Sequence, residues 1–262
     1  MLTSGTALKA TVLAGLLAGL LVAAYHFTLS EPVIDRAIAL EEQAAAAKGE
    51  SPQGAGTALE QPVVSRDVQK GLGLFLGWGL YGALAGLVFG GVFTLAQGKL
   101  PGDSAWRRGL ALAGLAFLGV ALLPFLKYPA NPPGVGDPDT HSLRVTVQLV
   151  FLALSVAGAV GAVVLHRVLA RRHATPRWIA GWLVALAAFG VYAAAIYLLM
   201  PPNPDAVNAP ADMVTAFRAL SLGGLALLWA VIGLLFGLFV RLFSRQAAPA
   251  QGILSNKLKT VS

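Results

Sequence analysis

Six long runs of apolar residues, separated by polar segments, follow one another along the chain of 262 residues. Each run is long enough to cross the membrane, since an α-helix needs roughly 20 residues to cross about 30 Å of hydrocarbon. No run shows the strict alternation of a membrane β-strand, and charged side chains stand only towards the ends of the runs. The pattern predicts an all-α integral membrane protein, a six-helix transmembrane bundle with spans over residues 11–29, 71–96, 109–126, 145–169, 178–200 and 219–243.

The composition excludes a soluble domain. Hydrophobic residues make up 56% of the chain and charged residues 12%, and the mean hydropathy is +0.71. Soluble domains carry about 25% charged residues, so half that share leaves too few polar side chains to cover a surface in water. The absence of cysteine also excludes disulfides, thiolate metal sites and a cysteine nucleophile.

The distribution of charge predicts an orientation. The N-terminus, two turns between spans and the C-terminal tail hold 12 Lys and Arg residues and one acid, Asp103, whereas the other three connections hold 7 basic and 11 acidic residues. By the positive-inside rule the first group is cytoplasmic. We therefore predict N-in, C-in topology, with one membrane domain over residues 1–243 and a flexible cytoplasmic tail over 244–262. The net charge of +7 orients the bundle and does not indicate nucleic-acid binding.

The first apolar run has a second interpretation as a secretory signal peptide. Lys9 precedes the run, and Val22-Ala23-Ala24 resembles a small-residue cleavage site. The run continues to Leu29, beyond the 7 to 15 residues of a usual signal core, which favours a retained span. Cleavage would leave five spans.

The chain also resembles itself at an offset of 72 residues, which aligns the third span with the fifth. A weaker match at an offset of 147 aligns the second span with the sixth, and each even-numbered span has an arginine near its outer start: Arg66, Arg144 and Arg218. We interpret the pattern as three helical hairpins in parallel repeat; chance similarity among Ala-, Leu- and Gly-rich helices is the alternative. The matched pairs at 72 are Trp106/Trp178, Gly109/Gly181, Phe117/Phe189, Pro129/Pro201, Asn131/Asn203, Pro132/Pro204 and Pro138/Pro210.

Glycines recur at helical spacing in the second span, at Gly73 and Gly77 and at Gly82, Gly86 and Gly90. Small residues four apart let two helix backbones approach closely in a membrane. We expect these glycines to serve helix packing.

The middle of the spans offers no catalytic chemistry. Ionisable residues there would be functional candidates, but the spans contain no Ser/His/Asp or His/Glu set, and the chain has no phosphate-binding Gly-x4-Gly-Lys-Ser/Thr motif. We therefore expect neither an enzyme nor an ATPase. His166 and His173 lie at the cytoplasmic edge among arginines, where we expect solvated or headgroup-facing side chains.

The first outer segment carries one group of candidate ligands. Ser30 followed by Pro32 predicts the N-cap of an amphipathic helix over residues 31–42, lying along the membrane surface. Glu31, Asp35 and Glu42 fall on its polar side, with His26 about one turn away.

The second outer segment, residues 127–141, carries another group, in which Asp137, Asp139 and His141 alternate after a Pro- and Gly-rich stretch. Imidazole and carboxylate without thiolate suit Co²⁺, Ni²⁺ or Zn²⁺ better than Cu⁺. Solvated acids, or a turn that caps the next helix at Thr140, are the alternative. The candidate metal ligands of the chain are His26, Glu31, Asp35, Asp137, Asp139 and His141.

Three stretches resemble the CbtA family of probable cobalt transporter subunits: residues 31–42 (EPVIDRAIALEE), 76–82 (LGWGLYG) and 127–140 (KYPANPPGVGDPDT). The resemblance extends from Leu13 to Phe243. The motif positions that match are Glu31, Asp35, Tyr128, Asn131, Pro132, Asp137 and Asp139; His141 follows the motif and is not part of it.

The resemblance implies Co²⁺ uptake through a bacterial inner membrane in support of cobalamin synthesis, with a small, single-helix, histidine-bearing partner of the CbtB type. Co²⁺ is then the transported ion, and no fixed cofactor is expected. The family is usually described with five spans, one fewer than the pattern predicts here. A second hypothesis, favoured by the Gly/Ala packing faces, is a structural or assembly subunit of a larger membrane complex that transports nothing.

Overall fold

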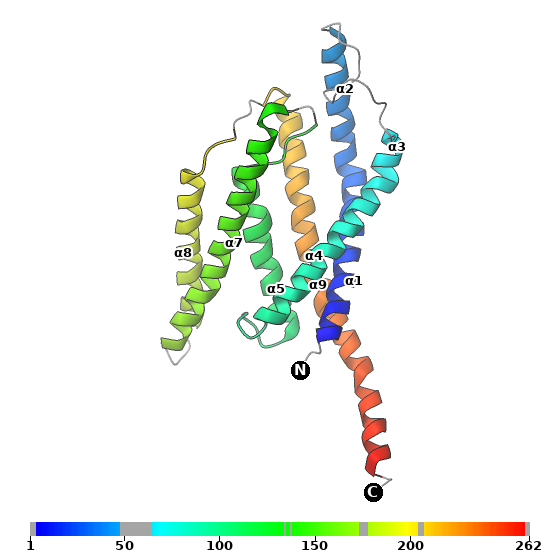
Figure 1. The fold of residues 1–262 in the computed structure, drawn as a ribbon, viewed down its shortest axis with the longest axis vertical. Coiled ribbons are helices and arrows are strands. Elements are labelled where there is room, and N and C mark those ends of the chain that lie inside the picture. The colour runs from blue at the N-terminus through cyan, green and yellow to red at the C-terminus, as the bar shows by residue number, and fades with distance from the viewer. Residues whose placement is uncertain are drawn as a thin grey trace. The chain divides into compact units, whose positions relative to one another are not determined.

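The computed structural model describes residues 4–47, 64–133, 135–136, 138–172, 178–203 and 207–259, and the elements within these ranges are all helical. Three of them, η1, η2 and η3, are π-helical, and η4 is a 3-10 turn. In chain order the elements are α1 (Ser4–Tyr25), η1 (His26–Ser30), α2 (Glu31–Ala47), α3 (Arg66–Val68), η2 (Gln69–Gly73), α4 (Leu74–Ala96), α5 (Ala105–Ala116), η3 (Phe117–Leu122), α6 (Leu123–Lys127), η4 (Pro138–Thr140), α7 (His141–Arg172), α8 (Trp178–Leu199) and α9 (Ala211–Lys259) (Figure 1).

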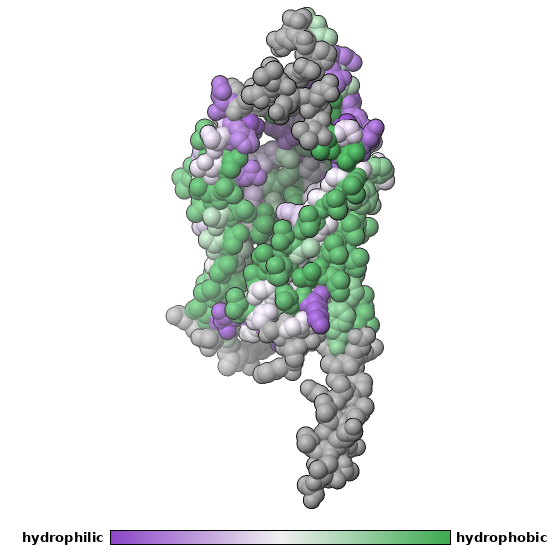
Figure 2. Space-filling model, turned by 45° about the vertical axis from the view of Figure 1, so that its right-hand side comes forward, coloured by the Kyte–Doolittle hydropathy of each residue, from purple (hydrophilic) through white to green (hydrophobic). Residues whose placement is uncertain are grey.

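Six helical stretches are long and apolar enough to cross a membrane, which confirms the predicted class of fold. Many of their large apolar side chains are exposed, among them Leu80 at 66%, and Figure 2 shows hydrophobic side chains along the helices in view. Such surfaces require lipid rather than water. The N-in, C-in orientation stays a prediction. The six stretches are Ala7–Ala44, Arg66–Ala96, Ala105–Lys127, His141–Ala170, Ala180–Leu199 and Ala211–Phe243.

Two predicted boundaries meet the structure differently. Helix α9 continues to Lys259, beyond the predicted end of the sixth span at residue 243, and the flexible cytoplasmic tail over 244–262 stays a prediction. Ser30 does not N-cap a new helix, because α1, η1 and α2 follow one another without a break, so the predicted cap is wrong. Helix α2 covers the predicted stretch 31–42, and its position along the membrane surface stays a prediction.

The chain divides into two compact units. Unit 1 comprises Met1–Leu21, Leu76–Leu115 and Leu227–Ser262, and unit 2 comprises Val22–Phe75 and Ala116–Ala226.

In unit 1, α1 and α4 meet backbone to backbone through glycine. A Cβ at Gly86 would overlap the carbonyl of Thr11, and a Cβ at Gly15 would overlap that of Gly82. This confirms the packing role predicted for Gly82 and Gly86. By contrast, a Cβ at Gly77 would meet nothing within 4 Å, so the role predicted for Gly77 is wrong: this glycine lies on a face of α4 without a close neighbour.

Aromatic side chains fill the rest of unit 1. The ring of Phe236 on α9 is fully buried, edge-to-face with Phe93 at 4.6 Å and with Phe89 at 5.5 Å between centroids. Close by, the guanidinium of Arg241 lies 4.0 Å from the centroid of the Trp106 ring. Small residues make the space, since a Cβ at Gly109 would overlap the Phe236 ring.

Unit 2 contains all three π-helical segments, and two of them precede a proline by the same spacing. Pro32 and Pro124 each stand two residues after the last residue of η1 and η3. A proline ring inside a helix clashes with the carbonyl four residues earlier and donates no hydrogen bond. A wider π turn relieves that clash. Accordingly, Glu31 N–H donates to the carbonyl of His26, five residues back, and Leu123 N–H to that of Leu118.

Helices α7 and α8 lie side by side in unit 2 (Figure 1). Tyr192 of α8 donates a hydrogen bond from Oη to the carbonyl of Leu154, at 2.9 Å. Near the start of α8, His166 stacks on Trp182 with ring centroids 4.1 Å apart. His166 is thus half-buried against an aromatic ring, where we expected a solvated side chain; His173 lies outside the described residues.

Candidate cation-binding site

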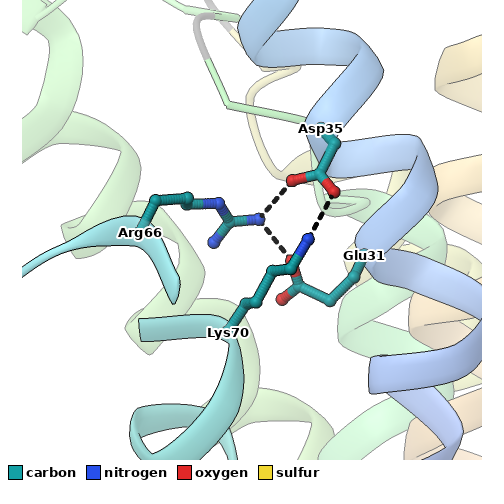
Figure 3. A network of polar contacts seen from close by, with 4 residues as sticks. All are labelled: Glu31, Asp35, Arg66 and Lys70. Carbon is teal, nitrogen blue, oxygen red and sulfur yellow. Dashed lines mark hydrogen bonds and ion pairs between the residues drawn. The ribbon is translucent and has the colours of Figure 1, made fainter. Parts of the chain in front are cut away.

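Four charged side chains from two helical segments of unit 2 form one network (Figure 3). Glu31 and Asp35 stand one turn apart on α2, and Arg66 and Lys70 stand one turn apart on α3 and η2. Residues four apart on a helix project from the same face. Two acids on one segment therefore meet two bases on the other.

Arg66 joins both acids. Its Nη2 donates to the carboxylate of Glu31 and to Oδ1 of Asp35, the latter at 3.1 Å, while Nζ of Lys70 donates to Oδ2 of Asp35 at 2.9 Å. Glu31 is only 5% exposed, whereas the side chains of Asp35, Arg66 and Lys70 are 42%, 36% and 34% exposed. A buried carboxylate is stable only when it is paired, and Arg66 provides the pairing.

His26 belongs to the same stretch of helix. Its Nδ1 lies 2.6 Å from the hydroxyl of Ser30, and both side chains are buried. Across from it, a Cβ at Gly224 of α9 would overlap Nε2 of the His26 ring. The absence of a side chain at Gly224 therefore creates the space that the imidazole occupies.

The network is flanked by a separate ion pair. Arg36 of α2 donates to Oδ2 of Asp212, near the start of α9, at 2.8 Å. Both side chains are more than half exposed, so water screens this pair and its contribution to stability is small.

The segment over residues 127–141 begins with residues that hold it against the rest of unit 2. Tyr128 Oη donates to the carbonyl of Pro201 at 2.8 Å, and Arg218 Nη2 donates to Oδ1 of Asn131 at 2.7 Å. Lys127 Nζ donates to the carbonyl of Tyr197 at 2.7 Å, and Pro132 is fully buried. Partial burial raises the pKa of the Tyr128 hydroxyl, so the phenol stays protonated and can donate. In this structure Tyr128, Asn131 and Pro132 therefore position the loop.

The later residues of that segment include the other three predicted ligands. Asp139 lies in η4 and His141 begins α7, both exposed, and Asp137 lies outside the described residues. Among the residues that the structure describes, no three His, Asp or Glu side chains form a group that could hold a metal ion. Of the six predicted ligands, the structure joins Glu31 and Asp35 in one network and places His26 on the adjoining turn.

Sequence reasoning missed the basic half of the network. Arg66 was noted as part of the repeat and Lys70 was not singled out, yet their spacing of four residues equals that of Glu31 and Asp35. Matching four-residue spacings of opposite charge on two predicted helices would have been the signal. Arg218, also noted for the repeat, proves to hold Asn131 of the 127–141 segment.

The apolar helices with exposed hydrophobic faces define a multi-pass membrane protein. The family described as "Probable cobalt transporter subunit (CbtA)" matches residues 5–241. The chain belongs to this family. Neither the curated proteins nor the solved structures give a match to the chain.

Proposed function

We propose that this chain is the membrane subunit of a Co²⁺ uptake transporter of the bacterial inner membrane, which supplies cobalt for cobalamin synthesis. Membership of a family of probable cobalt transporter subunits carries the proposal. In it, the carboxylates on the predicted outer side meet the ion first.

Glu31 and Asp35 are the carboxylates best placed for this role. Arg66 bonds to both, so their oxygens lie within reach of one group. Co²⁺ is a borderline cation that accepts carboxylate and imidazole ligands, and His26 stands on the adjoining turn. Water and side chains of the partner subunit would complete the coordination.

The membrane potential provides the driving force in this proposal. A divalent ion moving inward gains about 4.6 kcal/mol per 100 mV, twice the value for one elementary charge. The chain has no phosphate-binding motif of the P-loop type. We expect a small, single-helix, histidine-bearing subunit to assemble with this chain and receive the ion.

The direct test is uptake of radioactive cobalt by cells that carry this chain with the presumed partner. We expect the double variant Glu31→Gln/Asp35→Asn to lower the initial rate about 10-fold, the size of loss common when the groups around a metal are altered. Asp67→Asn is the matched control, because Asp67 is an exposed acid of α3 next to the network. Immunoblots of membranes check that each variant is inserted.

The segment over residues 127–141 is tested separately. The triple variant Asp137→Asn/Asp139→Asn/His141→Gln lowers uptake if these residues also collect the ion. Unchanged uptake in both sets of variants would remove the outer carboxylates from the mechanism while leaving the family assignment intact.

The second candidate is a structural subunit, favoured by the glycine-mediated contact of α1 and α4. This reading predicts that cells with the intact chain and its partner take up no more cobalt than cells without them. It also predicts that the chain purifies in a stoichiometric complex with proteins that do not transport cobalt. Growth of a cobalamin-dependent strain at limiting cobalt tests the link to cobalamin.

A further inference from the structure

We propose that Arg66 and Lys70 are tethered cations that compete with incoming ions for Glu31 and Asp35, and thereby determine which ions bind there. The inference rests on the proposed function, since it concerns the same two carboxylates. It adds a role for the two basic residues. They exclude monovalent ions, and they set the cobalt concentration at which the site fills.

The positions that an ion would use are occupied by the protein's own groups. Arg66 Nη2 contacts Oε2 of Glu31 and Oδ1 of Asp35, and Lys70 Nζ contacts Oδ2 of Asp35 (Figure 3). Three carboxylate oxygens are thus engaged by two cationic side chains. A metal ion that binds these oxygens directly must displace at least one of them.

The charge balance makes this displacement depend on the valence of the ion. Two carboxylates face one guanidinium and one ammonium, so the network is formally neutral. A monovalent ion would replace a hydrogen-bonded group of equal charge that is held nearby by its own chain, at a high effective concentration. A divalent ion brings the charge of both displaced groups in one ion and also coordinates the oxygens directly. Exchange therefore favours divalent ions.

The burial pattern allows the basic groups to leave. The side chains of Arg66 and Lys70 are 36% and 34% exposed, so each can turn into water without carrying its charge into an apolar region. Because a buried carboxylate is stable only when it is paired, Glu31, at 5% exposed, gives up its guanidinium only in exchange for an incoming ion. The paired state is thus protected from ions that bind these oxygens weakly.

The test uses cobalt binding by the purified full-length protein in detergent, measured by calorimetric titration. We expect Lys70→Gln to tighten Co²⁺ binding about fivefold, the equivalent of one exposed pair of about 1 kcal/mol. In the same variant, roughly 0.1 M NaCl should weaken cobalt binding more than it weakens binding to the unmodified protein, because one tethered competitor is gone. Choline chloride at equal concentration separates sodium competition from general screening.

Arg36→Gln is the matched control, because it removes one positive charge from α2 but breaks a different pair, that with Asp212. The proposal predicts no change in the sodium effect and less than a twofold change in cobalt affinity. The double variant Arg66→Gln/Lys70→Gln should tighten binding further where the protein remains folded, as judged by its elution as one symmetric peak. Lys70→Gln keeps the test valid if the double variant does not fold, because Arg66 still pairs with Glu31.

Unchanged or weaker cobalt binding by Lys70→Gln, or an equal effect of Arg36→Gln, would overturn the inference. The same titration on Glu31→Gln/Asp35→Asn distinguishes the two proposals. If that variant still binds cobalt as the unmodified protein does, the carboxylates are not the site and the proposed site fails. If it loses cobalt binding while Lys70→Gln is unchanged, only the role of the tethered cations fails.

Discussion

Each of the two units of this chain is held together internally by its own kind of contact. In unit 1, α1 and α4 touch through Gly15, Gly82 and Gly86 with no side chain between them, and aromatic rings fill the adjoining space. In unit 2, an ion-pair network and side-chain hydrogen bonds to backbone carbonyls join the segments. Close backbone packing at glycine suits a region surrounded by lipid, where dispersion contacts replace the hydrophobic effect.

The two units also differ in how regular their helices are. All three π-helical segments belong to unit 2, and none of the elements described in unit 1 is π-helical. Irregular helix within a membrane protein is accommodated where neighbouring groups satisfy the backbone, and it is often found at functional sites. The comparison shows that the irregular helical turns and the ion-pair network lie in the same unit.

The largest effect is expected from filling the glycine contact of unit 1. Gly86→Ala places a Cβ against the carbonyl of Thr11, and we expect the free energy of unfolding to fall by about 3 kcal/mol, the upper range for overpacking. Unfolding in mixed micelles with increasing SDS measures the change. Gly91→Ala is the matched control, because a Cβ there meets nothing within 4 Å; it should stabilise the helix by about 0.5 to 1 kcal/mol. Equal effects of the two variants would contradict packing by backbone contact.

An intermediate effect is expected from breaking the network of unit 2. Arg66→Gln leaves the buried carboxylate of Glu31 without its guanidinium, and we expect a loss of about 2 kcal/mol, reduced from the value for a fully buried pair because Arg66 is partly exposed. The same SDS titration measures it. The double variant Glu31→Gln/Arg66→Gln should recover most of the loss, since no unpaired charge remains. No recovery would mean that Arg66 stabilises unit 2 by packing alone.

The smallest effect is expected from the charged contact of unit 1. Arg241→Gln removes the guanidinium that lies over the Trp106 ring, and we expect a loss of about 0.5 to 1 kcal/mol, typical of an exposed cation–π pair. Tryptophan fluorescence during unfolding measures it, with Arg107→Gln, which breaks the exposed Asp103 pair, for comparison. A loss as large as that of Arg66→Gln would remove the contrast between the units, because polar contacts would then matter equally in both.

Much of the fold could be predicted from the pattern of residues alone. Six apolar runs correspond to the six membrane-spanning candidates, because run length and the absence of charge suffice to identify a spanning helix. The packing of Gly82 and Gly86 was predicted from their spacing, yet Gly77 with the same spacing packs against nothing. Spacing defines a face of the helix but does not say which helix lies against that face.

The site was only partly predictable. Glu31 and Asp35 were identified from a motif and an amphipathic pattern, but Ser30 was expected to begin a helix where the chain continues through η1. The preference of serine for the N-cap position, and of proline for the first turn, was applied to Ser30 and Pro32 without regard to the helix that precedes them. Here a π turn accommodates Pro32 and the Ser30 hydroxyl contacts His26 instead. Such a turn forms where hydrogen bonds to the carbonyl five residues earlier cost less than α-helical bonds to the carbonyl four residues earlier. The composition of the segment does not reveal that balance.

The sequence by itself determined that the described part of this chain is helical, with six stretches long and apolar enough to span a membrane. It also identified the acids and the family motifs, because hydrophobicity, charge and motif are properties of residues taken along the chain. Only the tertiary structure decided which residues meet. It brought Arg66 and Lys70 onto Glu31 and Asp35 across more than thirty residues of sequence. Pairing of that kind depends on the register of one helix against another, which is the sum of many small packing contacts and is not encoded in any single segment.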